Sequence, residues 1–382
     1  MTPAVDFIAP VSLSPVKLLI DGRKLGHGGI GVYTENLIQG LLQLGGASIA
    51  VVSTKAQADR VPFARDVEWI FDSSRPYSVD ELFFFSRRIP FSRFDLFHAP
   101  HYVLPFGIPI PTVVTVHDLI HIEHPERFFY PIVAKPLLSS AVSRATRVIA
   151  VSRDTKRALI SSLGVSADKV HYIPNAIAAF LGGDGGRENQ ASVGSSARPY
   201  LLSVLSNLKP HKGLEDLLRA YRSLQTSGAF HDLCPDLFLV GYGAERLGNT
   251  PALRSLVEGV RGVHVLGAVG TTELRDLYRK ARALVVPSVA EGFCLPALEA
   301  QACGTPVICR PVPAIRELLT EQDIVASDMS VEALASALAA GCARTDRTRG
   351  NIDTHLARFS LPVVATQVRT LYEEVIRGAV VE

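Results

Sequence analysis

Two hydrophobic patterns alternate along the chain. Short runs of apolar, mostly β-branched residues predict buried strands, and longer segments whose apolar residues recur every three or four positions predict amphipathic helices. In the first half of the chain, strands are predicted at residues 16–21, 49–52, 67–71, 95–98, 112–117, 147–151 and 169–173. Helices are predicted after residue 31 and at residues 79–88, 129–144 and 154–163. This alternation indicates a parallel sheet with helices on both faces.

A second block of the same kind begins near residue 200. Its predicted strands are 201–205, 237–240, 264–266, 284–286 and 307–309, and its predicted helices are 214–224, 253–260 and 273–281. Residues 181–199 are rich in glycine and serine and predict a flexible linker. We therefore expect an α/β chain with two doubly wound, Rossmann-like domains, residues 1–180 and 200–360.

The stretch 284–309 joins two of these strands through one short helix. Pro296 suits the first turn of a helix, and Gly304 suits the position just after its end. The loop 290–295 then places a row of backbone N–H groups at the start of the helix. Because such N–H groups carry partial positive charge, we expect this loop to bind an anion.

Two carboxylates bracket the expected anion site. Glu291 lies in the loop and Glu299 in the helix, and no basic residue is near either of them in the sequence. A carboxylate at this place is better suited to accept hydrogen bonds from sugar or ribose hydroxyls than to attract phosphate. The alternative is that Glu299 is a solvated helix residue and Glu291 an ordinary loop acid. The residues alone leave both interpretations open.

The same stretch resembles the E-x7-E signature of retaining family 4, or group 1, glycosyltransferases. The matching residues are Glu291-Gly292-Phe293, Leu295-Pro296, Glu299-Ala300 and Ala302-Cys303-Gly304-Thr305-Pro306-Val307. The resemblance implies the GT-B fold, in which two Rossmann-like domains face each other across a cleft. It also implies that Glu291 lies by the donor sugar, that Glu299 binds the ribose, and that the amides of residues 292–295 face the phosphates. Cys294 departs from the family, which commonly has glycine there.

The beginning of the second domain carries another part of the resemblance. The segment Ser206-Asn207-Leu208-Lys209-Pro210-His211-Lys212-Gly213 is similar to the family's loop in which a basic residue and a following lysine hold the donor diphosphate. Lys212 matches that lysine. Asn207 stands where many members have arginine, so Lys209 and His211 are the expected substitutes. The alternative interpretation is a solvated turn before a helix.

A glycine-rich segment, Gly26-His27-Gly28-Gly29-Ile30-Gly31, follows the first strand. It contains G-x-G-x-x-G, and one interpretation is a dinucleotide-binding fingerprint. Against this, the preceding loop is long and the second strand ends near Ser53 without an acid for the adenosine ribose. The family resemblance implies instead that Gly28, Gly29 and Gly31 lie beneath the donor phosphate.

Polar residues fall at the carboxyl ends of several predicted strands, which is where such sheets bind ligands. His117 is one of them. A lone histidine is often satisfied by local hydrogen bonds, but the resemblance at Thr115-Val116-His117-Asp118-Leu119 implies that His117 contacts the transferred sugar. We place five further residues in the expected acceptor cleft, namely Tyr33, His98, His101, Tyr102 and Asp118. The resemblance also implies that the last helix, 361–382, packs back on the first domain.

Composition and charge exclude several classes of protein. Of the 382 residues, 47% are hydrophobic and 20% charged, which suits large cores and excludes disorder for most of the chain. The net charge of +2 gives no reason to expect nucleic-acid binding. Five cysteines without C-x-x-C spacing indicate buried thiols rather than disulfides or a zinc site. A cytoplasmic protein is expected, because no apolar run is long enough to span a bilayer and residues 1–15 lack signal-peptide features.

Two segments, 83–93 and 127–147, mix aromatic or apolar residues with arginines. Such a mixture suits peripheral contact with an anionic membrane on its inner face. The other interpretation is that Phe83, Phe84 and Phe85 pack their helix against the sheet. Both interpretations stay open at the level of sequence.

The resemblance implies a retaining glycosyltransferase that needs no cofactor. The chain contains no D-x-D sequence, so Lys212 and the amides of residues 292–295 rather than a metal ion are expected to stabilise the leaving diphosphate. We expect His117, Glu291 and Lys212 to be the catalytic residues.

The donor is less well defined by the sequence. The segments Asp21-Gly22-Arg23 and His98-Ala99-Pro100-His101-Tyr102 resemble the mannosyltransferase-like branch of bacterial surface-polysaccharide synthesis. This favours GDP-mannose over UDP-sugars, with a glycan or a polyprenyl-linked oligosaccharide as acceptor. The alternative is a non-catalytic GT-B subunit that binds a nucleotide sugar or a partner protein, because Asn207 departs from the family.

Overall fold

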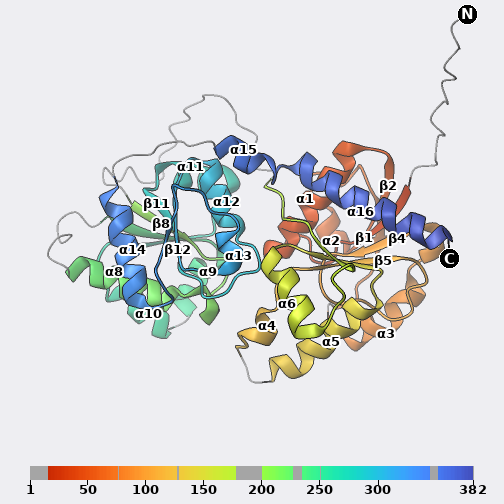
Figure 1. Cartoon of the computed structure of the whole chain (residues 1–382), viewed down its shortest axis with the longest axis horizontal. Helices are drawn as coiled ribbons and strands as arrows, with labels where there is room; N and C mark the ends of the chain where they lie inside the picture. Colours follow the sequence, from red (N-terminus) through yellow and green to blue (C-terminus); the bar gives the residue numbers. More distant parts are fainter. Residues whose placement is uncertain are drawn as a thin grey trace, which may run out of the picture.

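A computed structural model describes residues 16–75, 77–126, 129–177, 200–226, 235–249, 251–344 and 352–381. Two α/β units lie side by side, the first in red to yellow and the second in green to blue (Figure 1). Each contains one parallel sheet with helices on both faces, so the predicted fold class is confirmed. The predicted linker, 181–199, lies outside the described residues, and the domain boundaries stay a prediction.

The first sheet has the strand order β3-β2-β1-β4-β5-β6-β7, and every neighbouring pair is parallel. Its strands are β1 (Val16–Asp21), β2 (Ala47–Ser53), β3 (Glu68–Phe71), β4 (Leu96–Ala99), β5 (Thr112–Val116), β6 (Arg147–Ala150) and β7 (Val170–Tyr172). Its helices are α1 (Gly28–Leu44), α2 (Lys55–Ala58), α3 (Val79–Arg88), α4 (Ile120–Glu123), α5 (Tyr130–Arg144) and α6 (Arg153–Leu163), with a 3₁₀ turn η1 (Phe91–Arg93).

The second sheet has the order β10-β9-β8-β11-β12-β13 and is also parallel. Its strands are β8 (Tyr200–Val204), β9 (Asp236–Val240), β10 (Val263–Gly267), β11 (Ala283–Val286), β12 (Val307–Cys309) and β13 (Ile324–Val325). Its helices are α8 (Leu214–Thr226), α9 (Tyr242–Glu245), α10 (Pro251–Glu258), α11 (Thr271–Lys280), α12 (Leu295–Ala302), α13 (Pro313–Arg316) and α14 (Val331–Ala343), with 3₁₀ turns η2 (Pro210–Lys212) and η3 (Arg246–Asn249). The sequence did not predict β13 or α14.

The strand orders determine where a ligand can lie. In each sheet the order reverses direction beside the first strand, between β1 and β4 in one and between β8 and β11 in the other. Loops diverge at such a point and leave a crevice outside the carboxyl ends of the strands. The glycine-rich loop follows β1, the loop with Lys212 follows β8, and the loop with Glu291 follows β11. The predicted functional loops therefore border the two crevices.

The last helix returns to the first unit. Helix α15 (Ile352–Ala357) precedes α16 (Leu361–Val381), the blue helix that lies along α1 in Figure 1. Gly40 of α1 permits this close packing, because a Cβ at that position would lie 2.7 Å from the Cβ of Ala365. The Phe293 and Phe359 rings, 6.0 Å apart, join the second unit to the start of α16.

The aromatic residues of α3 divide between core and surface. Phe85 is fully buried against the first sheet, whereas Phe83 and Phe84 are 53% and 45% exposed. The interpretation that all three pack against the sheet is therefore wrong for two of them. Within the described part of the chain, no helix combines the length and the apolar character needed to cross a bilayer.

Candidate active site

A cavity of about 580 Å³ lies between the carboxyl ends of the two sheets, and we call it the cleft. The first unit lines it with residues of the glycine-rich loop and the end of β5, and the second with the loops after β8 and β11. The predicted site residues that line it are Gly28, Gly29, Gly31, His117, Asp118, Asn207, Lys209, His211, Lys212, Glu291, Gly292, Phe293, Cys294, Leu295 and Glu299. The structure thus brings together residues that are more than 200 positions apart in the sequence.

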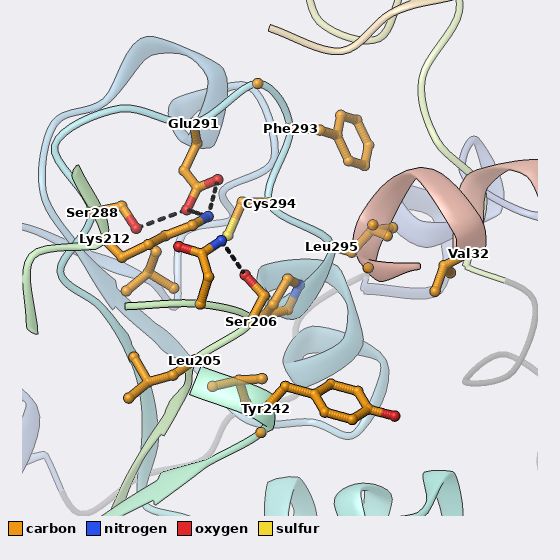
Figure 2. A pocket seen from close by; sticks show the side chains of 18 of the residues that line it. Val32, Leu205, Ser206, Lys212, Tyr242, Ser288, Glu291, Phe293, Cys294 and Leu295 are labelled. Carbon is orange, nitrogen blue, oxygen red and sulfur yellow. Dashed lines mark hydrogen bonds and ion pairs between the residues drawn. The ribbon is translucent and has the colours of Figure 1, made fainter. Parts of the chain in front are cut away.

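Lys212 and Glu291 form an ion pair in the wall of the cleft (Figure 2). The ammonium lies 2.7 Å and 2.9 Å from the two carboxylate oxygens, and the Ser288 hydroxyl donates to the same carboxylate at 2.7 Å. The side chains are only 19% and 11% exposed. Burial alone would lower the pKa of Lys212, but the Glu291 carboxylate raises it above its ordinary value. Lys212 is therefore a permanent cation in a poorly hydrated wall.

A buried arginine that sequence analysis missed supports the Lys212 turn. Gly213 ends η2 with φ of 68°, and a Cβ there would lie 2.2 Å from the Pro287 carbonyl oxygen. Arg310, fully buried at the end of β12, donates to that carbonyl at 3.1 Å and to the Asp216 carboxylate at 2.8 Å. The loops after β8 and β11 are thus fixed to each other. The position of Arg310 at a strand end is the only signal that could have indicated this.

Gly292 lies at a point where the backbones of the two units come close together. A Cβ on Gly292 would lie 1.9 Å from the His117 carbonyl oxygen and 2.9 Å from the Cβ of Asp118. Distances under 3 Å are not tolerated between such atoms, so only glycine fits here. The donor loop, residues 288–295, therefore touches the end of β5 directly.

Polar contacts also join the units around the cleft. The Lys209 ammonium lies 2.7 Å from the Glu126 carboxylate, and the Glu317 carboxylate accepts hydrogen bonds from the first two backbone N–H groups of α6, each at 2.9 Å. A carboxylate at a helix N-terminus is a favourable arrangement, because the free N–H groups there carry partial positive charge. These contacts hold the two sheets at the observed separation.

Two helices begin in the cleft without a side-chain cap. Neither His27 before α1 nor Cys294 before α12 accepts a hydrogen bond with its side chain, whereas the caps of α3, α6 and α14 do. Cys294 has φ of 81°, a left-handed conformation that costs a non-glycine residue about 1–3 kcal/mol. The unusual cysteine therefore adopts a backbone conformation that glycine adopts readily.

Glu299, like Glu291, is partly buried and lines the cleft. Its carboxylate accepts a hydrogen bond from the Tyr278 hydroxyl at 2.9 Å. Burial raises the pKa of Glu299 to about 7, although the Tyr278 hydroxyl acts in the opposite direction. Glu299 is therefore not a solvated helix residue, and it can change protonation state near neutral pH. Nothing in the sequence indicated the contribution of Tyr278.

The structure corrects our expectation that His211 supplies a positive charge. His211 is 7% exposed, and its buried Nδ1 has no hydrogen-bond partner. Burial and the neighbouring Lys212 ammonium both lower the pKa of His211, so the imidazole is neutral at physiological pH. Lys209 is paired with Glu126. Asn207 donates to the Ser206 hydroxyl at 3.3 Å and caps the Lys209 N–H at 3.0 Å.

His117 has a defined tautomer. Its Nε2 lies 3.0 Å from the Pro100 carbonyl oxygen, which can only accept a hydrogen bond, so Nε2 carries the proton and Nδ1 has a lone pair that can accept one. Burial lowers the pKa of His117, which keeps the ring neutral. Its backbone carbonyl, which meets Gly292, also accepts a hydrogen bond from the Thr155 hydroxyl at 3.2 Å.

Three residues expected in the acceptor cleft are buried inside the first unit instead. His98 is fully buried between the Tyr372 hydroxyl of α16 and the Thr115 hydroxyl, and burial lowers its pKa to about 3. Tyr33 is 3% exposed and bonds to the same Thr115 hydroxyl at 2.9 Å. His101 is 1% exposed and lies 3.2 Å from the Asp21 carboxylate. These side chains face the sheet or the covering helices, which the strand-end rule does not reveal.

The comparisons with known proteins agree with this geometry. Residues 27–179 match the family described as "Glycosyltransferase Family 4", and residues 199–343 match the one described as "Glycosyl transferases group 1". The chain belongs to the group 1 glycosyltransferases. The family predicted from residues 291–307 is therefore confirmed, and its matches cover both sides of the cleft.

Individual relatives of this glycosyltransferase are distant. The O-antigen chain mannosyltransferase RfbU of Salmonella typhimurium is 27% identical over 238 residues, which are 61% of this chain and 60% of the relative. A D-inositol 3-phosphate glycosyltransferase of Kineococcus radiotolerans is 32% identical over 46% of this chain and 42% of its own length. The crystal structure of Anabaena HepE with UDP-glucose superposes with a TM-score of 0.70 at 17% identity, covering 94% of this chain and 99% of that one. The last likeness confirms the GT-B fold.

We predict that Gly292→Ala separates the two units of this glycosyltransferase. The added methyl group would overlap the His117 carbonyl oxygen, so the donor loop must retract from the end of β5. A displacement of about 1 Å between reacting groups lowers turnover by about 10²-fold. Small-angle scattering should show a larger radius of gyration. Gly270→Ala is the matched control, since a Cβ there meets nothing within 4 Å; an unchanged radius for Gly292→Ala would contradict the prediction.

Proposed function

We propose that this chain is a retaining glycosyltransferase that transfers a hexose from a nucleotide-diphosphate sugar to a hydroxyl group of a glycan or lipid-linked oligosaccharide. The Lys212–Glu291 ion pair carries this proposal. It combines a diphosphate-binding cation and a sugar-binding acid in one narrow cleft, opposite the His117 backbone. Neither a surface ion pair nor a binding module needs such an arrangement. Family membership and the fold support the same reaction class.

The groups around Lys212 suit a leaving diphosphate. As the glycosidic bond stretches, negative charge grows on the diphosphate, and a cation already fixed in a poorly hydrated wall stabilises that state. The uncapped N-termini of α1 and α12 add backbone N–H groups with partial positive charge. The sequence carries no D-x-D, and these groups supply the counter-charge that a metal ion would otherwise provide. We therefore propose metal-independent transfer without a cofactor.

The two acids have separate roles in this proposal. Glu299, with a pKa near 7, accepts hydrogen bonds from the ribose hydroxyls of the nucleotide. Glu291 exchanges its bond to Lys212 for bonds to sugar hydroxyls when the diphosphate takes the ammonium. The neutral His117 offers Nδ1 as an acceptor for a hydroxyl of the transferred sugar. Attack on the face that the diphosphate leaves, with a diphosphate oxygen taking the acceptor proton, then retains the anomeric configuration.

The identity of the donor rests on resemblance. The Salmonella relative is named as a mannosyltransferase, which favours GDP-mannose, while the Anabaena neighbour is a complex with UDP-glucose. The alternative function is a non-catalytic subunit that binds a nucleotide sugar without transferring it. It is favoured by Asn207, which does not supply the charge of the family's arginine. The ion-paired Lys212 and the partly buried Glu299, both of which line the cleft, favour the enzyme.

A second proposal concerns the place where transfer occurs. Phe83 stacks on Phe106 with ring centroids 5.1 Å apart, and both rings are exposed at the surface of the first unit. The guanidinium groups of Arg87 and Arg144 lie over Phe84 and Phe106. Exposed aromatic rings next to cations suit an anionic membrane surface. This surface would bring the cleft to a lipid-linked acceptor.

We predict that GDP-mannose raises the melting temperature of the protein and is turned over by it. A ligand at 100 times its Kd adds about 2.7 kcal/mol to the free energy of unfolding. Released or transferred mannose should keep its α configuration in the first NMR spectra.

Lys212→Ala should lower kcat by about 10²–10³, because one preorganised charged donor is lost from the transition state.

Lys156→Ala, which removes an amine outside the cleft, is the control for this substitution. Turnover in excess EDTA should match turnover with added Mg²⁺. If none of GDP-mannose, UDP-glucose and ADP-glucose shifts the melting temperature, the proposed function is wrong. Binding without turnover in the presence of membrane-derived acceptor would favour the non-catalytic subunit.

We also predict that affinity for GDP-mannose falls as the pH drops below 7. Above its pKa of about 7, Glu299 is an anion that accepts hydrogen bonds from both ribose hydroxyls; below it, the bound proton removes that capacity. Since the donor diphosphate keeps its charge over this range, Kd should rise about tenfold from pH 8 to pH 6. Calorimetry on Glu299→Gln should give a flat profile. A profile of the same slope in both proteins would refute the role of Glu299.

A further inference from the structure

Tyr77 has an unusual backbone that the cleft described above does not explain. Among the described residues, only Tyr77 and Cys294 combine a side chain with a left-handed backbone, and φ of Tyr77 is 66°. Such a conformation costs about 1–3 kcal/mol and persists only where neighbouring contacts enforce it. Cys294 belongs to the donor loop. Tyr77 lies in the first unit, in the loop between β3 and α3, and it is 43% exposed.

A buried ionic network holds the Tyr77 backbone. The Tyr77 N–H donates to one oxygen of the Glu81 carboxylate, and the other oxygen accepts a hydrogen bond from Arg23 at 2.6 Å. The same guanidinium donates to both oxygens of Asp21, at 2.9 Å and 2.6 Å. Asp21 and Glu81 are fully buried and Arg23 is 4% exposed. Tyr77 is therefore connected through two acids and one arginine to the end of β1.

Holding a loop with this buried ionic network costs more free energy than holding it with apolar contacts. Removing charged groups from water costs several kcal/mol per ion, and apolar residues of the same volume often give equal or greater stability. Burial alone would raise the pKa of Asp21, but its bonds to Arg23 hold that pKa well below the ordinary value, so the pair is ionised. A network of this kind is understandable where a defined position matters more than stability.

Asp21, Glu81 and His101 bring potential metal ligands within 4.8 Å of one another. Arg23 already donates to both carboxylates. The Val103 N–H donates to Nδ1 of His101, so Nε2 carries the ring proton and donates to Asp21. The ligand atoms are thus engaged by hydrogen-bond donors. The cluster acts as an anchor within the protein.

The Tyr77 ring lies next to a second aromatic ring. Its centroid is 6.0 Å from that of Tyr102, with an angle of 48° between the planes, and we call these two residues the tyrosine pair. The Lys24 ammonium lies 4.3 Å from the Tyr77 centroid. Among the described residues, neither phenol hydroxyl has a hydrogen-bond partner. The tyrosine pair therefore presents two partly open rings, two free hydroxyls and one cation.

The tyrosine pair lies at the same end of the first sheet as the cleft. Tyr77, Lys24 and Tyr102 follow β3, β1 and β4, so all three lie at the carboxyl ends of the first sheet, as the cleft does. Asp118, which lines the cleft, connects the two places. Burial is the main cause that raises the pKa of Tyr102 to about 12, and the Asp118 carboxylate is the second cause. The same carboxylate also raises the pKa of Tyr77. Asp118 is also a residue that a side chain at Gly292 would meet, so the tyrosine pair and the Gly292 contact share this neighbour.

We propose that the tyrosine pair is the platform on which the first unit binds a sugar residue of the acceptor, with Arg23 and Glu81 as positioning residues. This inference rests on the proposed function. A pyranose ring has an apolar C–H face that packs on an aromatic ring, and hydroxyl groups at its edge that need polar partners. The tyrosine rings supply the aromatic surface for the apolar face. The polar partners for the sugar hydroxyls are Lys24, Asp118 and the phenol hydroxyls. A lipid tail would leave these polar groups without partners.

Saturation-transfer NMR on the full chain in the presence of GDP tests the platform. The probes are methyl α-mannoside, methyl β-galactoside and methyl N-acetyl-β-glucosaminide. At least one should receive saturation from the wild-type protein, and Tyr77→Gly should weaken its binding about tenfold. Glycine adopts a φ of 66° without strain, so this substitution removes the ring and keeps the loop. Tyr77→Phe should retain most of the binding.

Phe71→Ala, which removes another exposed aromatic ring near the end of β3, is the matched control and should bind like the wild type. Glu81→Gln should weaken the same glycoside, because a neutral amide releases Arg23 and the Tyr77 N–H. The rise in melting temperature that GDP-mannose causes should be the same in Glu81→Gln as in the wild type. A general loss of structure would reduce this rise.

Two outcomes overturn the platform. One is that no glycoside binds the wild type; the other is that binding is equal in wild type and Tyr77→Gly. The melting shift with GDP-mannose, measured on the same samples, separates these results from a failure of the proposed function. If the shift is present, only the platform is wrong. If the shift is absent, the proposed donor is wrong as well.

Discussion

The separation of the two sheets is set by the contact between Gly292 and the His117 carbonyl oxygen. No side chain fits between them, and the ion pair of Lys209 with Glu126 and the Glu317 carboxylate at the start of α6 act in the same direction. Because of this contact, the donor loop lies against the end of β5 instead of facing open solvent. The narrowness of the cleft, which strengthens the charge interactions inside it, therefore depends on this glycine together with the polar contacts beside it.

Within the cleft, Glu291 keeps Lys212 in place before a ligand arrives. An unpaired buried ammonium would be costly, and the carboxylate removes that cost while leaving the cation at the wall. In the proposed function, a diphosphate takes over the ammonium and releases Glu291 toward the sugar. The same pair would therefore keep the empty site stable and divide its two members between phosphate and sugar in the occupied site. Arg310 fixes the geometry from behind, through the Pro287 carbonyl and Asp216.

The sequence predicted the sheets well, because strands buried on both faces appear as continuous apolar runs. Pro296 located the start of α12 to within one residue, but α1 begins at Gly28, inside the glycine-rich segment that was predicted to be a turn before the helix. The sequence did not predict β13, which has only two residues. It also did not predict the pairing of Lys212 with Glu291, because these residues are 79 positions apart. His98 shows the limit most clearly. The alternation along β4 places it on the face opposite Phe97, but only the structure reveals that α16 covers that face with Tyr372.

The most direct test of this account is calorimetry of GDP binding to Glu291→Gln and Lys212→Met. GDP lacks the transferred hexose. In the proposed site its diphosphate therefore contacts the Lys212 ammonium, and nothing in GDP contacts Glu291. The account predicts that Glu291→Gln binds GDP more tightly than the wild type, since Lys212 no longer has to leave a carboxylate, and that Lys212→Met binds it more weakly. Equal losses of affinity in both variants would show that the pair serves the structure alone, and would contradict the central claim.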